Sequence, residues 1–185
     1  DILFFWIARM ILMSQFLLGE VPFKTVYLHG LVRDDKNRKI SKSLGNNIDP
    51  VDMIKQYGAD AVRMAMIIGT SVGNDSKISP DKFKAYKHFA NKIWNVSRFI
   101  LMNLEGYDPN YQIDWTTEEE CIDQRNHVLR FRNVCEREVH EEMKNFRFYL
   151  AAENLYGYFW HSFADHVVEE SKKSLQSPNS DERQK

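Results

Sequence analysis

The strongest constraint on the fold is a helical repeat of apolar side chains that fills the chain after Pro80. From Pro80 to Leu104, positions that share a helix face at about 100° per residue are apolar or small, and the opposite face is polar. The predicted core face comprises Phe83, Tyr86, Phe89, Ala90, Ile93, Ser97, Ile100 and Leu104. A second helix is expected after a capping box at Thr116–Glu120, and a third from about Phe146 to Lys172. Three such helices predict a bundle.

The segment before Pro80 shows a different pattern. We expect a buried helix over Asp1–Leu18, where Arg9 interrupts the apolar run and argues against a membrane span. The apolar, β-branched and aromatic run Thr25–Leu31 predicts a strand.

Two short helices are expected next, Val51–Tyr57 and Ala59–Ile68. The first has Asp49 as N-cap, Pro50 at its start and Gly58 as a left-handed stop. The stretch Gly69–Ser79 is rich in turn residues and is interpreted as a linker. We therefore predict one domain over residues 1–75, a helical domain over 76–175 and a disordered tail over 176–185.

Between the predicted strand and these helices lies the cation cluster Lys39-Ile40-Ser41-Lys42-Ser43. Two lysines three positions apart, accompanied by the small hydroxyl residues Ser41 and Ser43, suit a polyphosphate such as that of ATP. Taken alone, a short run with two lysines is more often a solvated turn. Its sequence context decides between these interpretations.

Composition excludes few functions. The formal net charge is −1, so contacts with nucleic acid must come from local basic faces. Neither the cysteines Cys121 and Cys135 nor the six histidines show a metal-ligand spacing, and a bound metal is not predicted. We see no targeting segment and expect a reduced, cytoplasmic protein.

Several motifs surround the lysine cluster in a characteristic order. They are Asp1–Met10, Val21–Lys24, His29–Asp34, Gly45–Pro50, Tyr57–Arg63, Asn91–Asn95, Tyr158–Trp160 and Glu169–Lys172. In order and spacing they resemble the valyl-tRNA synthetase family of class I aminoacyl-tRNA synthetases, whose signature loop is usually K-M-S-K-S. Ile40 replaces the usual Met, an apolar exchange. The resemblance covers nearly the whole chain.

This resemblance implies an α/β fold followed by an all-α fold: the C-terminal part of a Rossmann-like catalytic domain, then an anticodon-binding helix bundle. It implies a valine–tRNA ligase reaction with ATP and Mg as substrate, valine, and tRNA(Val) as partner. The catalytic residues would be Lys42 and Lys39, with ATP contacts from Lys39, Ser41, Lys42, Ser43, His29 and Gly30. The amino-acid pocket would include Ile2, Trp6 and Asp1. The tRNA-binding face would comprise Lys84, Lys87, Asn91, Asn95 and Arg98.

The family's other catalytic signature and its editing domain have no counterpart in this sequence. We therefore expect the chain to work with missing N-terminal catalytic and editing parts of the same enzyme, and to be inactive alone. No membrane or DNA partner is predicted. Two alternatives remain at this point: a stand-alone helical RNA-binding module whose lysine loop is a relic, and an isoleucyl or leucyl relative.

Overall fold

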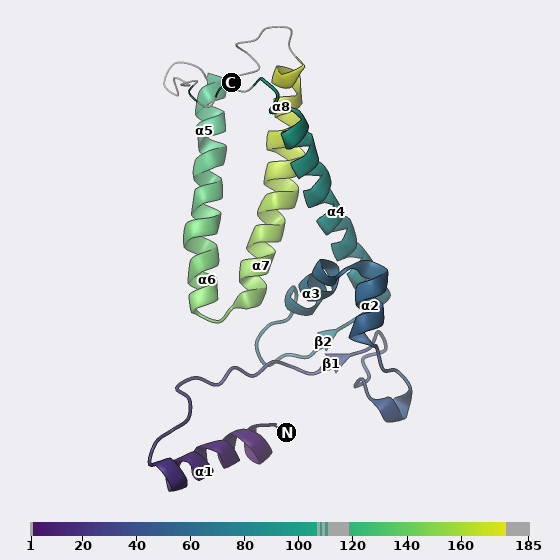
Figure 1. Cartoon of the computed structure of the whole chain (residues 1–185), viewed down its shortest axis with the longest axis vertical. Coiled ribbons are helices and arrows are strands. Elements are labelled where there is room, and N and C mark those ends of the chain that lie inside the picture. The colour runs from purple at the N-terminus through teal and green to yellow at the C-terminus, as the bar shows by residue number, and fades with distance from the viewer. Residues whose placement is uncertain (1, 107, 109, 111–118, 177–185) are drawn as a thin grey trace.

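The computed structural model describes residues 2–106, 108, 110 and 119–176, which form a front part and a helical part (Figure 1). The front part contains η1 (Leu3–Ala8), α1 (Arg9–Leu18), β1 (Val32–Arg33), η2 (Lys42–Leu44), α2 (Pro50–Tyr57), α3 (Ala59–Ile67) and β2 (Ser76–Lys77). The helical part begins with α4 (Pro80–Met102). One rod follows as α5 (Glu119–Arg132), η3 (Asn133–Val139) and α6 (His140–Lys144), and another as α7 (Phe148–Gly157), η4 (Tyr158–Val167) and α8 (Val168–Leu175). The capping-box residues Thr116 and Thr117 and all of the predicted tail 176–185 except Gln176 lie outside the described residues; Gln176 is the C-cap of α8.

Local side-chain chemistry sets the ends of the short helices much as the sequence predicts. The Asp49 carboxylate accepts a hydrogen bond of 2.8 Å from the backbone N–H of Val51, and Pro50 occupies the first helical position of α2. Gly58 ends this helix with a φ of 92° and a ψ of 151°, so its φ is positive but its conformation is not the expected left-handed one. This extended turn lets Gly58 start α3 directly.

The predicted strand over Thr25–Leu31 is wrong, because strand pairing begins only at Val32. β1 and β2 form a two-stranded parallel sheet in which Val32 pairs with Ser76 and Arg33 with Lys77. The Asp75 carboxylate fixes this junction by accepting a 2.8 Å hydrogen bond from the N–H of Leu31. The apolar run before Leu31 has the composition of a strand but no partner strand among the described residues, and a strand needs a paired neighbour.

A compact core lies where α2, α3 and the start of α4 meet the sheet. Its buried members are Val62, Ala65, Ile78 and Phe83, and Val32, Ile48 and Tyr57 pack around them. The rings of Tyr57 and Phe83 stack with their centroids 5.6 Å apart. Val32 of β1 packs against this core, so the loop that carries the lysine cluster begins at a strand whose position is fixed.

The helical part has its own aromatic core around Phe89 of α4. The ring centroid of Phe89 lies 4.6 Å from that of Tyr156, 5.7 Å from that of Phe159 and 5.9 Å from that of Trp160. Figure 1 shows the α7–α8 rod between α4 and the α5–α6 rod. With only one rod beside it, α4 leaves part of its apolar face uncovered, so the predicted core positions Ile93 and Ile100 are in fact exposed. Leu104, also predicted to be in the core, lies beyond the end of α4 and is exposed.

Besides the core at the start of α4, contacts from Tyr27 and Gly69 join the front part to the foot of the helical part. The ring of Tyr27 lies 5.3 Å from that of Phe148 and 6.4 Å from that of Phe146, centroid to centroid. The backbone N–H of Gly69 donates a 3.2 Å hydrogen bond to the carboxylate of Glu153. These contacts set α7 against the end of α3 and the extended segment before β1.

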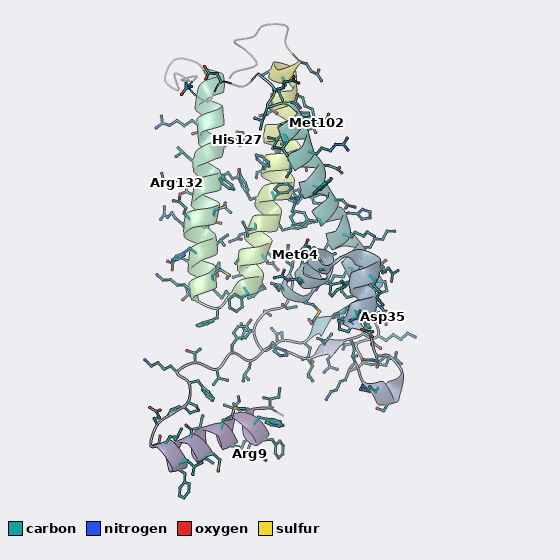
Figure 2. The ribbon with its side chains drawn as sticks, in the orientation of Figure 1. Arg9, Asp35, Met64, Met102, His127 and Arg132 are labelled. Carbon is teal, nitrogen blue, oxygen red and sulfur yellow. The ribbon has the colours of Figure 1, made fainter. Side chains whose placement is uncertain are left out.

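The first helix does not have the buried position that its apolar sequence predicts. Phe4 is 81% exposed and Phe16 84% exposed, and η1 and α1 contain no buried residue. Figure 1 shows α1 apart from the other helices, and Figure 2 shows Arg9 on it away from the other elements. The expectation fails because no other element of the described chain packs against this largely apolar helix.

Candidate functional site

The lysine cluster follows β1 as a short, ordered loop. A tight turn returns the chain beside β1, since the N–H of Asp34 donates to the carbonyl of Arg38 at 2.9 Å and Arg33 and Lys39 form an isolated antiparallel bridge. Ser41 then caps η2 by accepting a 3.3 Å hydrogen bond from the N–H of Leu44 through Oγ. Lys42 is therefore the first residue of a capped helical turn.

The buried carboxylate of Asp34 holds this loop in place through hydrogen bonds. Asp34 is 6% exposed, and its Oδ2 accepts hydrogen bonds from Asn46 Nδ2 at 3.0 Å and from Arg38 Nε at 2.8 Å. Its Oδ1 accepts a 2.8 Å hydrogen bond from the backbone N–H of Arg38. The hydrogen bond from Asn46 is the largest influence lowering the pKa of Asp34; burial opposes it, and the contacts with Arg38 add to it.

The two predicted catalytic lysines, Lys39 and Lys42, are exposed on the same loop. Within the part of the chain that the structure describes, neither Lys39 nor Lys42 has a hydrogen-bond or ion-pair partner for its Nζ. The hydroxyl groups of Ser41 and Ser43 lie 3.1 Å apart and share a hydrogen bond. The loop thus presents two unneutralised positive charges on an ordered backbone, which suits binding of a polyanion.

His29 and Gly30 lie in the segment that precedes β1. The Nδ1 atom of His29 lies 2.8 Å from the carbonyl oxygen of Gly30, and His29 is exposed. A Cβ at Gly30 would lie 1.8 Å from the carbonyl oxygen of Asn74. The sequence predicts that Gly30 allows close approach to a ligand, and the structure shows close approach to the linker of the same chain.

The predicted amino-acid pocket is not assembled by the described residues. Ile2 is 53% exposed and Trp6 58% exposed on the isolated first helix, and Asp1 lies outside the described residues. Figure 1 shows this helix separated from the loop that carries Lys42. The structure therefore does not bring the two predicted sites together.

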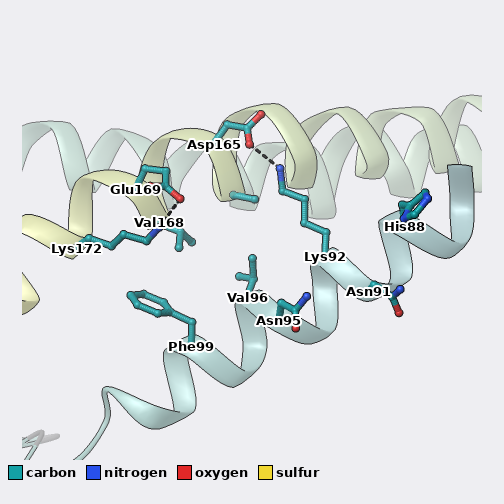
Figure 3. A pocket seen from close by; sticks show the side chains of 11 residues that line it. His88, Asn91, Lys92, Asn95, Val96, Phe99, Asp165, Val168, Glu169 and Lys172 are labelled. Carbon is teal, nitrogen blue, oxygen red and sulfur yellow. Dashed lines mark hydrogen bonds and ion pairs between the residues drawn. The ribbon is translucent and has the colours of Figure 1, made fainter.

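All five residues of the predicted tRNA-binding face, Lys84, Lys87, Asn91, Asn95 and Arg98, are exposed on α4. Lys87 Nζ donates a 2.9 Å hydrogen bond to the carbonyl of Gln56, which ties α4 to α2. Asn91 and Asn95 are among the residues that line a groove between α4 and the η4–α8 segment, with a volume of about 530 Å³ (Figure 3).

This groove adds residues that the sequence did not predict as site residues, although Lys92, Glu169 and Lys172 lie within the motifs of the resemblance. They include His88, Lys92 and Phe99 on α4 and Asp165, Glu169 and Lys172 on the opposite rod. Lys92 donates a 2.5 Å hydrogen bond to Asp165 and lies 4.2 Å from the ring centroid of Trp160. That hydrogen bond is the main cause of the lowered pKa of Asp165, which burial partly opposes. The motifs Asn91–Asn95 and Glu169–Lys172 are visible in the sequence, but only the packing of α4 against η4–α8 shows that they line one groove.

Other kinds of site find no support in the described residues. Among them, no group of three or more His, Cys, Asp or Glu side chains is arranged to hold a metal ion. No helix in this same part of the chain is both long and apolar enough to cross a membrane.

Two segments of the chain match known protein families. Residues 1–79 match the family of tRNA synthetases class I (I, L, M and V), and residues 125–185 match the anticodon-binding domain of tRNA ligase. The chain thus combines a segment of the class I tRNA synthetase family with a following segment of the anticodon-binding family. The fold class predicted from the sequence is confirmed.

Within this class the chain is homologous to valine–tRNA ligases. It is 45% identical over 177 residues to the valine–tRNA ligase of Thermotoga maritima, covering 96% of this chain and 20% of the relative. It is 40% identical over 190 residues to that of Aquifex aeolicus, covering 100% of this chain and 16% of the relative. The resemblance predicted from the motifs is confirmed, and the chain spans about a fifth of the length of the curated relatives it matches.

A solved structure supports the fold alone. The Agrobacterium radiobacter K84 agnB2 LeuRS, a leucyl-tRNA synthetase crystallised in a ternary complex with tRNA and LeuAMS, superposes with a TM-score of 0.62 at 20% identity. The match covers 96% of this chain and 25% of that chain. The predicted domain boundary at residue 75 lies close to the end of the first family match and stays a prediction.

Proposed function

We propose that this chain is part of a cytoplasmic valine–tRNA ligase, which activates valine with ATP and Mg and transfers it to tRNA(Val). The observation that carries this proposal is the pair of exposed ammonium groups on an ordered loop, in a chain 45% identical to a valine–tRNA ligase. In activation, a carboxylate oxygen of valine attacks the α-phosphorus of ATP. The bond to the bridging oxygen breaks, pyrophosphate leaves, and a valyl-adenylate forms.

Lys42 and Lys39 would act on the negative charge that develops on the departing pyrophosphate. Contacts that tighten as charge develops lower the barrier, because they stabilise the transition state more than the ground state. Ser41 and Ser43 would donate hydroxyl hydrogen bonds to the same phosphates. We assign His29 to a nucleotide contact, and Gly30 to the close packing of the backbone that presents His29.

We assign valine selection to the first helix. Trp6 and Ile2 are one turn apart and would supply a rigid indole and a branched aliphatic wall, with Asp1 at its edge. A wall of this kind excludes larger side chains by steric clash. It discriminates weakly against a hydroxyl isostere such as threonine.

We assign the anticodon arm of tRNA(Val) to α4. The cations Lys84, Lys87 and Arg98 would meet phosphates, and the groove beside them suits an unstacked base. Its amides, Asn91 and Asn95, can donate and accept hydrogen bonds at a base edge, and the ring of Phe99 offers a stacking surface.

Adenylate formation tests the catalytic proposal. In the full-length protein that carries this chain, Lys42→Ala should lower valine-dependent ATP–pyrophosphate exchange by about a hundredfold or more, with little change in the KM for valine. Lys36→Ala is the matched control, since Lys36 is also exposed in the same hairpin. Equal losses in both variants would contradict a specific role for Lys42.

The same assay separates the alternatives. Valine-dependent exchange identifies the valine ligase, and exchange with isoleucine or leucine identifies a relative with another specificity. A protein that binds tRNA but catalyses no exchange with any of the three would be the stand-alone RNA-binding module.

A further inference from the structure

Two side chains that flank the lysine cluster close the loop at its base. Asp34 precedes the cluster and Asn46 follows it, and Asn46 Nδ2 donates a 3.0 Å hydrogen bond to Asp34 Oδ2. Asp34 is buried and Asn46 is half-buried, whereas Lys39 and Lys42 are exposed. The hydrogen bond between Asp34 and Asn46 therefore joins the two ends of the loop on its buried side, and the two lysines lie on its exposed side.

Asn46 also holds the backbone between those ends. Its Nδ2 donates a 3.1 Å hydrogen bond to the carbonyl of Lys39, and its Oδ1 accepts a 2.9 Å hydrogen bond from the N–H of Ser41. One amide thus satisfies backbone groups on both sides of Ile40. These bonds fix the points from which the side chains of Lys39 and Lys42 project.

We propose that Asp34 and Asn46 are positioning residues for the pyrophosphate-binding lysines and act on adenylate formation only through them. This inference rests on the function proposed for Lys42 and Lys39. The reason is geometric: a lysine side chain is long and flexible, so its reach to a phosphate is defined only if its backbone is fixed. A misplacement of about 1 Å at a reacting centre can cost on the order of a hundredfold in rate.

A double-mutant cycle in the full-length protein tests this coupling. Asn46→Ala should lower the kcat of valine-dependent exchange by about tenfold or more and leave the KM for valine unchanged. In a Lys42→Ala background the same substitution should cost much less, because the side chain that Asn46 positions is already gone.

Asn47→Ala is the matched control, because Asn47 is the neighbouring residue of the same type and is exposed. It should leave kcat unchanged. If Asn46→Ala behaves like Asn47→Ala, or costs the same factor with and without Lys42, Asn46 does not act through the lysine and the proposal is overturned. If Lys42→Ala itself has no effect, the proposed catalytic role fails, and this result is visible without any Asn46 variant.

Thermal unfolding distinguishes a loss of kcat caused by misplaced lysines from one caused by loss of the folded structure. Asn46→Ala should unfold cooperatively, since its bonds are confined to the loop and to Asp34. Should it fail to fold, Asp34→Asn probes the same link from the other side at constant side-chain size. It should reproduce the kcat loss and its dependence on Lys42, and a folded Asp34→Asn variant with normal kcat would overturn the proposal.

Discussion

At the residue scale, Asp34 shows how a carboxylate is kept charged under a cationic loop. Its pKa is lowered first by the hydrogen bond from Asn46, and burial opposes this shift. Because the folded pKa lies below the usual unfolded value of about 3.9, ionisation of Asp34 stabilises the fold above about pH 4. This contribution is lost as the pH falls from that value through the folded pKa.

We therefore predict that Asp34 stays ionised at about pH 3, where an ordinary aspartate is mostly protonated. The carbon NMR signal of its carboxyl group, followed against pH, measures this directly. Asn46→Ala should move the midpoint of the titration upward, and Asn47→Ala should not. A wild-type midpoint near the ordinary value of about 3.9 would contradict the prediction.

Gly30 provides a second prediction, which concerns stability. Gly30→Ala should destabilise the protein by roughly 1–3 kcal/mol, because its Cβ would lie 1.8 Å from the carbonyl oxygen of Asn74 and the backbone must shift. Gly157→Ala is the matched control. Gly157 has helical dihedral angles, and a Cβ added there would have no neighbour within 4 Å, so alanine should be neutral or slightly stabilising.

Denaturant unfolding of the two variants compares them directly. Similar midpoints for Gly30→Ala and Gly157→Ala would show that the contact between Gly30 and the linker can relax without cost.

At the element scale, the sequence predicts best where the signal is local. The ends of α2 are encoded by Asp49, Pro50 and Gly58, which act on their own neighbours. The start of α4 follows from Ser79 and Pro80 in the same way. The lysine cluster is also recognisable from the sequence, because its residues are consecutive.

Predictions fail where a distant element decides the outcome. The run around Tyr27 has the composition of a strand, but strand formation depends on a partner, and Ser76 and Lys77 pair with the residues that follow Leu31. The hydrogen bond between Asp34 and Asn46 could not be predicted from the sequence for a similar reason. Asp34 and Asn46 are twelve positions apart, and only the folded hairpin brings them together.

The polar face of α4 yields a prediction for the whole element. Replacing Lys84, Lys87 and Arg98 with glutamine should weaken tRNA binding and flatten its salt dependence, since each lost phosphate contact removes roughly 0.7–0.9 from the log–log slope. The helix should survive, because all three side chains are exposed. Lys87→Gln alone controls for the hydrogen bond to Gln56.

Filter binding over a range of salt concentrations measures both quantities, and thermal melting checks the fold. A folded triple variant with unchanged affinity and slope would show that this face is only solvated.

At the scale of the whole molecule, the apolar first helix has the largest physical consequence. Large apolar side chains such as Phe4, Phe5, Leu12 and Phe16 are exposed together on η1 and α1. Patches of this kind drive association in water. We predict that the isolated 185-residue chain self-associates in a concentration-dependent way.

Sedimentation velocity across a range of concentrations tests this prediction. Phe4→Ser with Phe16→Ser should shift the chain toward monomer. Serine substitution at Trp94 and Leu101, which are exposed on α4, serves as a control for apolar surface elsewhere. A wild-type chain that stays monomeric at every concentration would contradict the prediction.

The junction between β2 and α4 connects the helical part directly to the sheet that carries the cationic loop. α4 has 23 residues and is therefore roughly 35 Å long, and its root at Ser79 lies two residues after β2. β2 is joined to β1, and β1 leads into the turn that carries Lys39. The far end of the helical part at Met102 is therefore joined to the cationic loop by a short path that runs through α4, the paired strands and the turn after β1.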